Sequence, residues 1–533
     1  MSGLGSPEAQ AQYHVLAGEM AAGRQQPEMA AEEFLKALAF APDAQLAARA
    51  TALALAAGRE DLALTASRKW HQIDPNSLDA REVITRLTLR AGLTDEAFEQ
   101  CEAIVKDHPG GIEDGFRHVA LLLSQEPDKS DAALALMDRL VALYPKHSSA
   151  YRAKALLAQR FNHGDVAEVA AREAVKLDPT SRDAAMLLAS ILIKKGGVAE
   201  ADGLVDGAVK NAKNAADLRL GYARLLIESN QRDAAHVQLQ KVLAIEPNNG
   251  DALLALALLA LEEKKLDEAE ARLRDLAKLP DKQMDATYFL GRVAELRNRP
   301  EQALAQYEKV TSGNQALDAL VRRATMLGKL KRMPEAREIF EQLRHQYSPL
   351  ATRFYVGEGE MLIDAGQNSE ALTLYNTALQ QDPDDGDLLY ARSLAFERLN
   401  QIDHAEADLK NLLEKAPDDA RALNALGYML TVHTNRYEEA QKLIAHAMEL
   451  SPNDPAVIDS MGWLQFKQGR AKDALPLLQK AMSLLPDPEI AAHLGEVLWT
   501  LGDKEQAHSV LNGALKTAPD NALLRDTVNR LAQ

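Results

Sequence analysis

Residues 359–383 read GEMLIDAGQNSEALTLYNTALQQDP, and the spacing inside this stretch decides the fold. Its apolar residues recur every three or four positions, which is typical of helices and not of strands. One small residue, two alanines, one bulky ring and a final proline stand at fixed offsets: Gly359, Ala371, Ala378, Tyr375 and Pro383. Small residues let two helices approach closely, and proline cannot continue a helix. The stretch therefore predicts two packed helices that end at the proline.

The same offsets recur along the whole chain. In the windows that end at Pro179, Pro486 and Pro519, the corresponding residues are Ala155, Ala167, Ala171 and Ala174; Gly462, Ala474, Leu478 and Ala481; and Gly495, Ala507, Leu511 and Ala514. Prolines return at steps close to 34 residues or twice that number: Pro42, Pro75, Pro109, Pro145, Pro179, Pro247, Pro280, Pro349, Pro383, Pro417, Pro452, Pro486 and Pro519. A fixed period of this length predicts an all-α solenoid of about fifteen helix–turn–helix repeats.

The repeats leave short segments at both ends of the chain. We expect four regions: an appended or flexible N-terminus (1–10), N-terminal and central repeats (11–313), C-terminal repeats (314–519) and a capping helix (520–533). The consensus is weaker around Thr51, Thr85 and Gly313, although the period continues through them. A terminal cap needs a polar outer face. The last segment supplies one with Arg525, Asp526, Asn529 and Arg530.

Composition excludes several classes of function. The net charge of −17 over 533 residues argues against nucleic-acid binding, because no basic stripe is present to neutralise phosphates. The most apolar run, from Ala252 to Leu261, is about half the length that a membrane-spanning helix needs. The single cysteine, Cys101, falls at a bulky apolar position of a second helix. We interpret it as a packed core thiol and not as a reactive nucleophile.

No residue pattern in the chain indicates a catalytic, nucleotide-binding or metal-binding site. Its 13 histidines are scattered and form neither HExxH nor a Cys/His cluster. The chain also lacks a P-loop, a glycine-rich dinucleotide turn and a GxSxG motif. We therefore predict that the protein is not an enzyme, that it has no catalytic residue or metal site, and that it uses no cofactor.

The repeat pattern resembles the tetratricopeptide repeat family: a small residue, alanine, a bulky apolar residue, alanine and proline. This resemblance implies a superhelix that binds other proteins, with the first helix of each pair lining a concave groove. A clamp for chaperone tails is not expected. Arg421 and Asn424 suit such a clamp, but the neighbouring repeat offers Asp387 and Tyr390.

Groove positions at repeat offsets near 2, 5, 9 and 12 give a C-terminal patch in three successive repeats. Its members are Asn424, Tyr428, Asp459, Trp463, Phe466, Glu496 and Trp499. Aromatic residues beside polar groups are the usual anchors of a protein interface. Packing against the neighbouring helix explains the same residues, so both interpretations stay open.

The same offsets give an apolar central stripe across three other repeats. Its members are Met186, Ile193, Leu220, Ile227, Leu254, Leu258 and Leu261. An apolar concave stripe suits an amphipathic helix from a partner. Self-association through the groove and tighter superhelical winding are the alternatives.

Three segments carry a more specific resemblance: Leu423–Tyr428 (LNALGY), Asp459–Trp463 (DSMGW) and His493–Trp499 (HLGEVLW). They are similar to the C-terminal block of a proteobacterial family with these repeats that includes outer-membrane lipoproteins, a block that many relatives share. With its repeat number and length, the whole chain resembles those lipoproteins of the family that bind the periplasmic carboxyl-terminal processing serine protease. The resemblance implies an adaptor that activates this protease and delivers peptidoglycan cross-link hydrolases to it. It also implies a periplasmic location and an outer-membrane lipid anchor on a cysteine upstream of the sequence. A scaffold of an envelope export or assembly machine, such as exopolysaccharide secretion, is the alternative.

Overall fold

The computed structural model of the chain describes residues 6–210 and 214–531. Within these two ranges the regular structure consists of α-helices and two short 3-10 helices, and no strand is present. The all-α prediction is therefore confirmed. The chain forms two compact units, Met1–Asp275 and Leu276–Gln533.

The helices of the first unit are α1 (Pro7–Gly23), α2 (Pro27–Leu38), α3 (Ala44–Ala56), α4 (Glu60–Ile73), α5 (Leu78–Ala91), α6 (Thr94–Asp107), α7 (Ile112–Leu123), α8 (Ser130–Leu143), α9 (Ser148–Arg160), α10 (Gly164–Leu177), α11 (Arg182–Lys194), α12 (Val198–Val209), α13 (Ala215–Glu228), α14 (Arg232–Ile245), α15 (Gly250–Glu262) and α16 (Leu266–Leu276). The 3-10 helix η1 (Pro127–Lys129) precedes α8.

The helices of the second unit are α17 (Gln283–Leu296), α18 (Pro300–Tyr307), α19 (Ala316–Lys329), α20 (Met333–Gln346), α21 (Ala351–Asp364), α22 (Asn368–Leu379), α23 (Gly386–Arg398), α24 (Ile402–Lys415), α25 (Ala420–His433), α26 (Tyr437–Leu450), α27 (Pro455–Lys467), α28 (Ala471–Leu484), α29 (Pro488–Leu501), α30 (Lys504–Thr517) and α31 (Ala522–Leu531). The 3-10 helix η2 (Ser348–Leu350) precedes α21.

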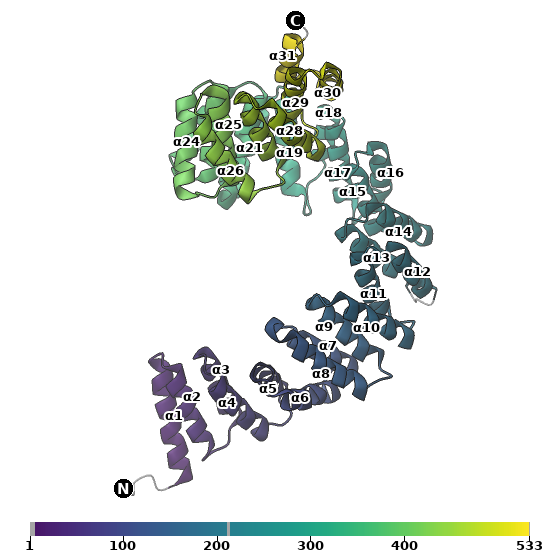
Figure 1. Ribbon diagram of the computed structural model, residues 1–533, viewed down its shortest axis with the longest axis vertical. Helices are drawn as coiled ribbons and strands as arrows, with labels where there is room; N and C mark the ends of the chain where they lie inside the picture. Colours follow the sequence, from purple (N-terminus) through teal and green to yellow (C-terminus); the bar gives the residue numbers. More distant parts are fainter. Residues whose placement is uncertain (1–5, 211–213, 532–533) are drawn as a thin grey trace. The chain divides into compact units, whose positions relative to one another are not determined.

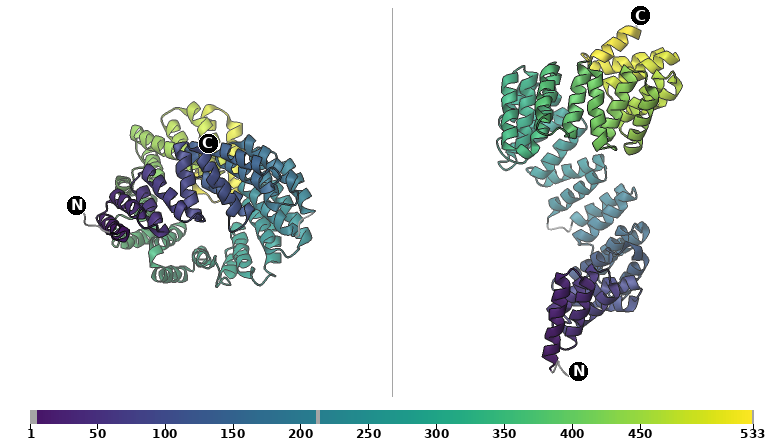
Figure 2. Two further views of the ribbon diagram at one scale, coloured as in Figure 1. Left: turned by 90° about the horizontal axis from the view of Figure 1, so that it is seen from below. Right: turned by 90° about the vertical axis from the view of Figure 1, so that its left-hand side faces the viewer.

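Consecutive helices pack as hairpins. Such packed pairs recur along the described residues, from α1 with α2 through α13 with α14 to α29 with α30, and α31 follows the last pair (Figure 1). The first helix of a pair also contacts the first helix of the next, as α21 does with α23 and α25 with α27. In the second unit the green helices stand side by side (Figure 2). The predicted solenoid of helix–turn–helix repeats is confirmed.

The first helix begins earlier than expected from the sequence. α1 starts at Pro7, and the Ser6 hydroxyl accepts a hydrogen bond from the Ala9 N–H at 3.2 Å, which caps the helix. Residues 7–10 are therefore helical, which corrects their assignment to a flexible N-terminus. The rest of that assignment, residues 1–5, lies outside the described residues. The expected boundary between residues 313 and 314 falls in the loop between α18 and α19 and stays a prediction.

The small residue of each repeat marks a close approach of two helices. A methyl group added at Gly359 on α21 would overlap the ring of Tyr375 on α22, which is fully buried. A methyl group added at Gly495 on α29 would lie 2.7 Å from the side chain of Leu511 on α30. Any larger residue would push the helices apart. The reason inferred from the sequence for the small residue is thus confirmed at both positions.

Two repeats with a weak consensus keep the same packing with threonine at the small position. Thr51 on α3 and Thr85 on α5 are both buried. Their hydroxyls donate to carbonyl oxygens one turn earlier in the same helix, Thr51 to Ala47 at 2.8 Å and Thr85 to Arg81 at 2.7 Å. An internal partner removes the cost of burying the hydroxyl. The hairpin therefore tolerates a small polar residue where other repeats have glycine or alanine.

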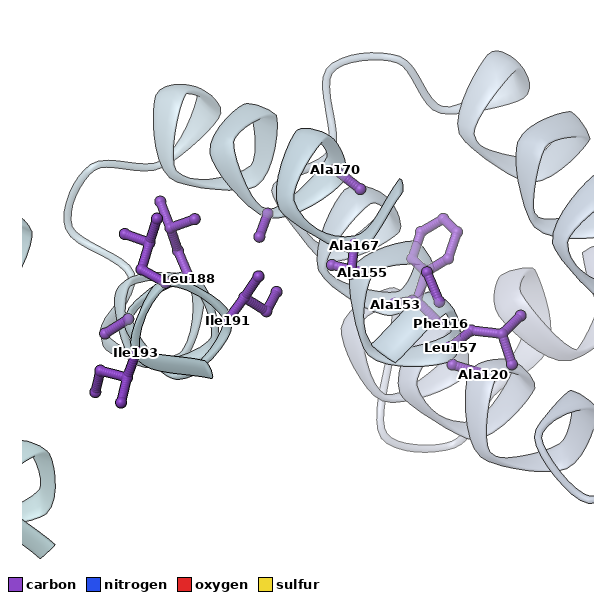
Figure 3. Packing of buried hydrophobic residues seen from close by; sticks show 14 of the residues in the cluster. Phe116, Ala120, Ala153, Ala155, Leu157, Ala167, Ala170, Leu188, Ile191 and Ile193 are labelled. Carbon is purple, nitrogen blue, oxygen red and sulfur yellow. The ribbon is translucent and has the colours of Figure 1, made fainter. Parts of the chain in front are cut away.

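The apolar core of the first unit runs from one hairpin into the next. Phe116 on α7, Leu157 on α9 and Ile191 on α11 belong to one buried cluster (Figure 3). Ile191 points from α11 toward α9, whereas Ile193 points away from α9 on the same helix (Figure 3). Ile193 is only 4% exposed, so α11 is buried on both of these sides. Each such side chain contributes roughly 1.5–3 kcal/mol to stability.

Helix α31 packs on the apolar core of the second unit. Leu524 on α31 is fully buried against Ala491 on α29 and Leu511 on α30. On the polar side of α31, Arg530 forms ion pairs with Asp526 and with Glu496 on α29. The helix therefore covers the last hairpin with an apolar face and presents charges outward; its role as a terminal cap stays a prediction.

Two further expectations concern the Cys101 thiol and membrane-spanning helices. Cys101 on α6 is fully buried, and this burial raises the pKa of its thiol to about 12, as expected for a packed core thiol. Across residues 6–210 and 214–531, no helix has the length and apolarity to cross a bilayer.

Candidate functional site

The predicted C-terminal patch has a polar centre in the second unit, where side chains from three first helices meet. We call this centre the histidine cluster; its members are Tyr428 from α25, Asp459 and Trp463 from α27, and Glu489 and His493 from α29. An aspartate caps the start of each helix by accepting backbone N–H bonds: Asp419, Asp454 and Asp487. These caps fix where each helix begins, and so which residues share the inner face.

His493 is the most buried polar member of the cluster, with an exposure of 3%. Its Nδ1 lies 3.0 and 3.1 Å from the two carboxylate oxygens of Asp459. The Trp463 ring stacks on the imidazole with 4.0 Å between ring centroids and an angle of 15°. Burial of a polar ring is tolerated when its nitrogens are paired. One face of Trp463 is therefore covered by the protein itself.

Tyr428 joins the histidine to a second carboxylate. Its hydroxyl donates to Glu489 Oε1 at 2.5 Å and lies 3.5 Å from His493 Nε2. Burial raises the pKa of the phenol, and the nearby charge of Glu489 raises it further. The phenol therefore stays protonated and acts as a donor. Because both ring nitrogens of His493 face partners and the phenol is not ionised, the cluster suits packing and orientation better than nucleophilic chemistry.

The other aromatic residues of the patch lie at the edge of the cluster. Phe466 lies 5.1 Å from Trp463 between ring centroids. Trp499 on α29 is half-buried and carries Lys504 Nζ over its ring, 4.6 Å from the centroid. Glu496 is paired with Arg530 of α31. Phe466 and Trp499 keep partly exposed surface, so both remain available to a partner.

Asn424 differs from its neighbours in its hydrogen bonding. It is half-buried on α25, one turn before Tyr428. Its Oδ1 is shielded from solvent and accepts no hydrogen bond from the described part of the chain. An unpaired buried acceptor costs about 1–3 kcal/mol.

The central stripe is only partly accessible. Ile193 and Leu220 are 4% and 8% exposed and pack in the core of the first unit, which corrects their placement on a free groove surface. Met186 packs against α13, where a methyl group added at Gly221 would lie 3.8 Å from its Cε. Five members keep exposed surface: Ile227, which is 36% exposed, and the half-buried Met186, Leu254, Leu258 and Leu261. Most of the accessible part of the stripe therefore lies on α13 and α15.

A small cavity opens beside the stripe, between α7, α9 and α11. Its volume is about 190 Å³. Ala153, Leu156 and Leu187 supply its apolar surface. Arg117 and Arg152 stand among its charged lining residues. This cavity was not predicted, because two of its apolar residues, Ala153 and Leu187, fall between the groove offsets used to read the sequence.

Comparison with known proteins identifies the family. Models described as tetratricopeptide repeat match residues 227–289, 321–386, 362–427, 420–454 and 465–531. A TPR repeat-containing protein of Pseudomonas aeruginosa is 35% identical over 489 residues, which is 91% of this chain and 82% of that protein. The chain belongs to the tetratricopeptide repeat (TPR) family. A TPR solenoid of this kind is a scaffold for protein–protein interaction.

More distant relatives share parts of the TPR array. Cellulose synthase operon protein C of Pseudomonas fluorescens is 24% identical over 430 residues, which is 73% of this chain and 33% of that protein. A crystal structure of a thermophilic TPR protein in Thermus thermophilus is 23% identical, with a TM-score of 0.32; the match covers 34% of this chain and 99% of that one.

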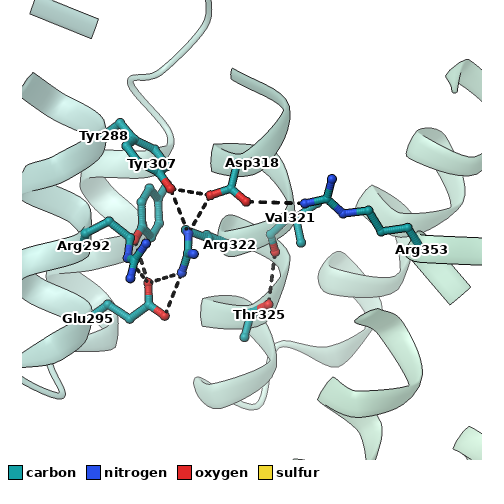
Figure 4. Close-up of polar contacts among 9 residues, drawn as sticks. All are labelled: Tyr288, Arg292, Glu295, Tyr307, Asp318, Val321, Arg322, Thr325 and Arg353. Atoms are coloured by element: carbon teal, nitrogen blue, oxygen red, sulfur yellow. Dashed lines mark hydrogen bonds and ion pairs between the residues drawn. The ribbon is translucent and has the colours of Figure 1, made fainter. Parts of the chain in front are cut away.

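A second polar network links three consecutive TPR repeats of the second unit, from α17 to α21 (Figure 4). Arg322 Nη1 lies 3.0 Å from Glu295 Oε2, and Arg322 Nε donates to Asp318 at 2.7 Å. The Tyr288 hydroxyl also donates to Asp318. Although burial opposes it, these two donors hold the pKa of Asp318 below its usual range. With its charges paired, the network fixes the packing of neighbouring repeats.

His493 and Glu489 were not chosen from the sequence. Glu489 stands at offset 2 of its TPR repeat, which is one of the offsets used. An exposed glutamate, however, does not by itself indicate a binding residue. His493 stands at offset 6, four residues after offset 2 and three before offset 9. Residues at these spacings share one face of a helix. Including offset 6 would have found the histidine.

Proposed function

We propose that this TPR protein is a non-catalytic adaptor for a periplasmic carboxyl-terminal processing serine protease. In this proposal it binds and activates the protease and delivers peptidoglycan cross-link hydrolases to it. The main support for this proposal is a sequence similarity over nearly the whole chain: 91% of the chain matches a pseudomonad TPR protein at 35% identity. The identity of the partner comes from the resemblance of the whole chain, in repeat number and length, to outer-membrane lipoproteins that bind this protease.

The mechanism is co-location. A partner held on the solenoid meets a second bound partner at an effective concentration in the millimolar range for short, flexible separations. The accessible surfaces suited to binding are the α13–α15 part of the central stripe and the edge formed by Phe466 and Trp499. Each combines exposed apolar area with charged neighbours, as interface anchors do. A lipid anchor on an upstream cysteine would hold the adaptor at the outer membrane, in the periplasm.

The test is reconstitution from purified components. The protease and a cross-link hydrolase from the same bacterium are incubated with and without the adaptor, and hydrolase cleavage is followed by gel. We expect cleavage to accelerate at least tenfold with the adaptor, and to return to the basal rate when Ile227 and Leu258 are both changed to Asp. Val237→Asp, an exposed position on the second helix α14, is the matched control. An unchanged cleavage rate with wild-type adaptor would rule the proposal out.

A second candidate function is a scaffold in an envelope export machine. The observation that favours it is the similarity to cellulose synthase operon protein C, which extends over 73% of this chain. In a pull-down with solubilised envelope, this alternative predicts recovery of synthase or outer-membrane pore components without the protease. The adaptor proposal predicts the reverse.

A further inference from the structure

Helix α1 leaves three large apolar side chains uncovered on one face. Tyr13, Leu16 and Met20 are 54%, 65% and 59% exposed. Their spacings of three and four residues place them along the same side of the helix. We call this set the N-terminal edge. Apolar residues exposed singly are ordinary on protein surfaces, whereas a row of large ones marks an interaction surface.

Two members of the N-terminal edge occupy positions that the next repeat uses for packing. With the first repeat beginning at residue 11, Tyr13 stands at offset 3 and Met20 at offset 10. The equivalent residues of the second repeat are Leu46 and Leu53 on α3. Both pack against a buried cluster that includes Phe34, which lies on α2 of the first repeat. Offsets 3 and 10 therefore face the preceding repeat.

The same two offsets are covered throughout the rest of the array. Ile191, at offset 10 of its repeat, points toward α9 of the preceding repeat (Figure 3). In every later repeat within the described residues, the side chains at offsets 3 and 10 are buried or half-buried. Examples are Ala80 and Leu87 on α5, Phe116 and Leu123 on α7, and Ile490 and Val497 on α29. The N-terminal edge thus has the chemistry of a repeat–repeat interface, but its side chains stay exposed.

The ionisable neighbours of the N-terminal edge already have partners in the first unit. His14 Nδ1 lies 2.7 Å from Glu33 Oε2, and Glu19 forms an ion pair with Arg49 on α3. An unpaired charge is costly to bury, whereas a paired one is tolerated. A second surface that covers the edge therefore strands neither His14 nor Glu19.

The last described helix has a different outer surface. α31 exposes Arg525, Asp526, Asn529 and Arg530. Contact between the N-terminal edge of one copy and this charged surface of another would take charges out of water, so head-to-tail stacking is disfavoured. Two N-terminal edges, in contrast, are alike and apolar. A surface that meets its own copy gives a closed two-fold dimer and not a filament.

We propose that two copies of the chain associate through their N-terminal edges, with α1 of one copy packed against α1 of the other. A two-fold axis close to Leu16 makes the two helices antiparallel and places Tyr13 of each copy opposite Met20 of the other. Contact between a thioether and an aromatic ring is favourable. One helix per copy covers less than the roughly 800 Å² per partner of a standard interface, so we expect a weak dimer with a Kd of about 10–100 µM. This association does not depend on the protease or on its substrates.

Sedimentation equilibrium of the full chain, from about 1 to 300 µM, tests the association. We expect the average mass to rise from that of one chain toward that of two and to stop there. The mass of one chain at every concentration would overturn the proposal, because the edge would then serve another occupant. A mass that keeps rising beyond two chains would overturn it as well, because it would indicate head-to-tail stacking.

Single substitutions locate the contact. Leu16→Glu and Met20→Glu should each weaken the dimer at least tenfold, since each puts two charges into an apolar contact. Val169→Glu on α10 is the matched control: Val169 is 70% exposed and lies away from the N-terminal edge, so its dimer should match wild type. Circular dichroism checks that all variants fold. Wild-type association of Leu16→Glu would contradict the proposal.

A groove variant and a cross-link exclude association through another surface. Changing Ile227 and Leu258 on the central stripe to Asp together should leave the dimer unchanged, and loss of the dimer in this variant would overturn the proposal. Leu16→Cys, close to the two-fold axis, should form a disulfide-linked dimer under mild oxidation, whereas Val169→Cys should not. The buried Cys101 cannot contribute to such a link. Equal cross-linking of the two variants would place the contact elsewhere.

Discussion

The hydroxyl of Tyr428 lies 2.5 Å from Glu489, although the two residues are 61 positions apart and stand on α25 and α29. The repeat between them, which begins with α27, is spanned by this contact. Side chains two repeats apart meet only on the inner side of a curved array, where the distance between helices is shortest. The bridge therefore indicates that first helices line the concave side here, as expected for a TPR solenoid.

Removal of the Tyr428 hydroxyl should loosen the last repeats. Tyr428→Phe deletes the bond to Glu489 and should cost about 1–2 kcal/mol, since hydrogen bonds to charged groups lie at the upper end of the range. Hydrogen exchange of α29 amides should accelerate about tenfold. Tyr437→Phe is the control, because that hydroxyl makes only a 3.4 Å contact with Asn435. Equal exchange in both variants would show that the bridge has no energetic role.

The histidine cluster predicts strong coupling between two residues. His493→Phe keeps a ring against Trp463 but leaves the buried carboxylate of Asp459 unpaired, which should cost about 3 kcal/mol or more. Changing Asp459 to Leu in the same protein removes the stranded charge and should recover most of the loss. Urea unfolding of the two single variants and the double variant measures this coupling. Strictly additive losses would mean that the two side chains do not interact.

The helix crossing at Gly359 should not accept a methyl group. Gly359→Ala collides with Tyr375 and should destabilise the protein by about 1–3 kcal/mol, because a packed core resists insertion. Gly203→Ala on α12 is the matched control: nothing lies within 4 Å of its added methyl group. That change should stabilise by roughly 0.5–1 kcal/mol, since alanine favours helix. Thermal unfolding followed by circular dichroism distinguishes the two signs.

Acid should weaken the second unit through Asp318. Its pKa is lowered in the folded protein, so the unfolded chain, where aspartate titrates near 3.9, takes up the proton first as pH falls. The stabilisation is thus present above about pH 4 and is lost as pH falls through the folded pKa. Asp318→Asn should therefore show a smaller drop in urea midpoint between pH 7 and pH 3 than wild type. Glu301→Gln, on the exposed side of α18, should show the wild-type drop.

The Cys101 thiol should not react with alkylating reagents in the native protein. Its thiol is fully buried and its pKa is raised to about 12, so almost no thiolate exists at pH 8. We expect no alkylation by iodoacetamide under native conditions and complete alkylation in 8 M urea, followed by mass spectrometry. Rapid native labelling would contradict the buried position.

The fold was predictable because the same packing residues recur at the same spacing in successive repeats. The glycine at 359 and the ring at 375 stand at a spacing that brings them together in a helix hairpin, and the same spacing returns through the chain. The site was less predictable. Groove offsets correctly brought Tyr428, Asp459 and Trp463 to one centre, where Trp463 stacks on His493 and Asp459 binds its Nδ1.

The solvent exposure of each groove side chain could not be derived from the same offsets. Ile193 and Leu220 stand at groove positions yet lie in the core, because the depth of a side chain depends on how closely the next helix crosses. Gly221 allows α13 to approach Met186, a relation between two helices that neither repeat reveals alone. Arg152 likewise stands at a groove position, but its ion pair with Asp183 of the next repeat, at 3.6 Å, is a relation between two helices that the offsets do not give.

The bridge from Tyr428 to Glu489 also bears on cooperativity. A TPR array behaves approximately as a one-dimensional chain in which each repeat is coupled only to its nearest neighbours, so it can fray one repeat at a time. A contact that skips a repeat adds a next-nearest coupling. The repeats from α25 to α30 are then coupled more strongly than nearest-neighbour contacts alone would make them, so force applied beyond α30 would be shared among the three repeats.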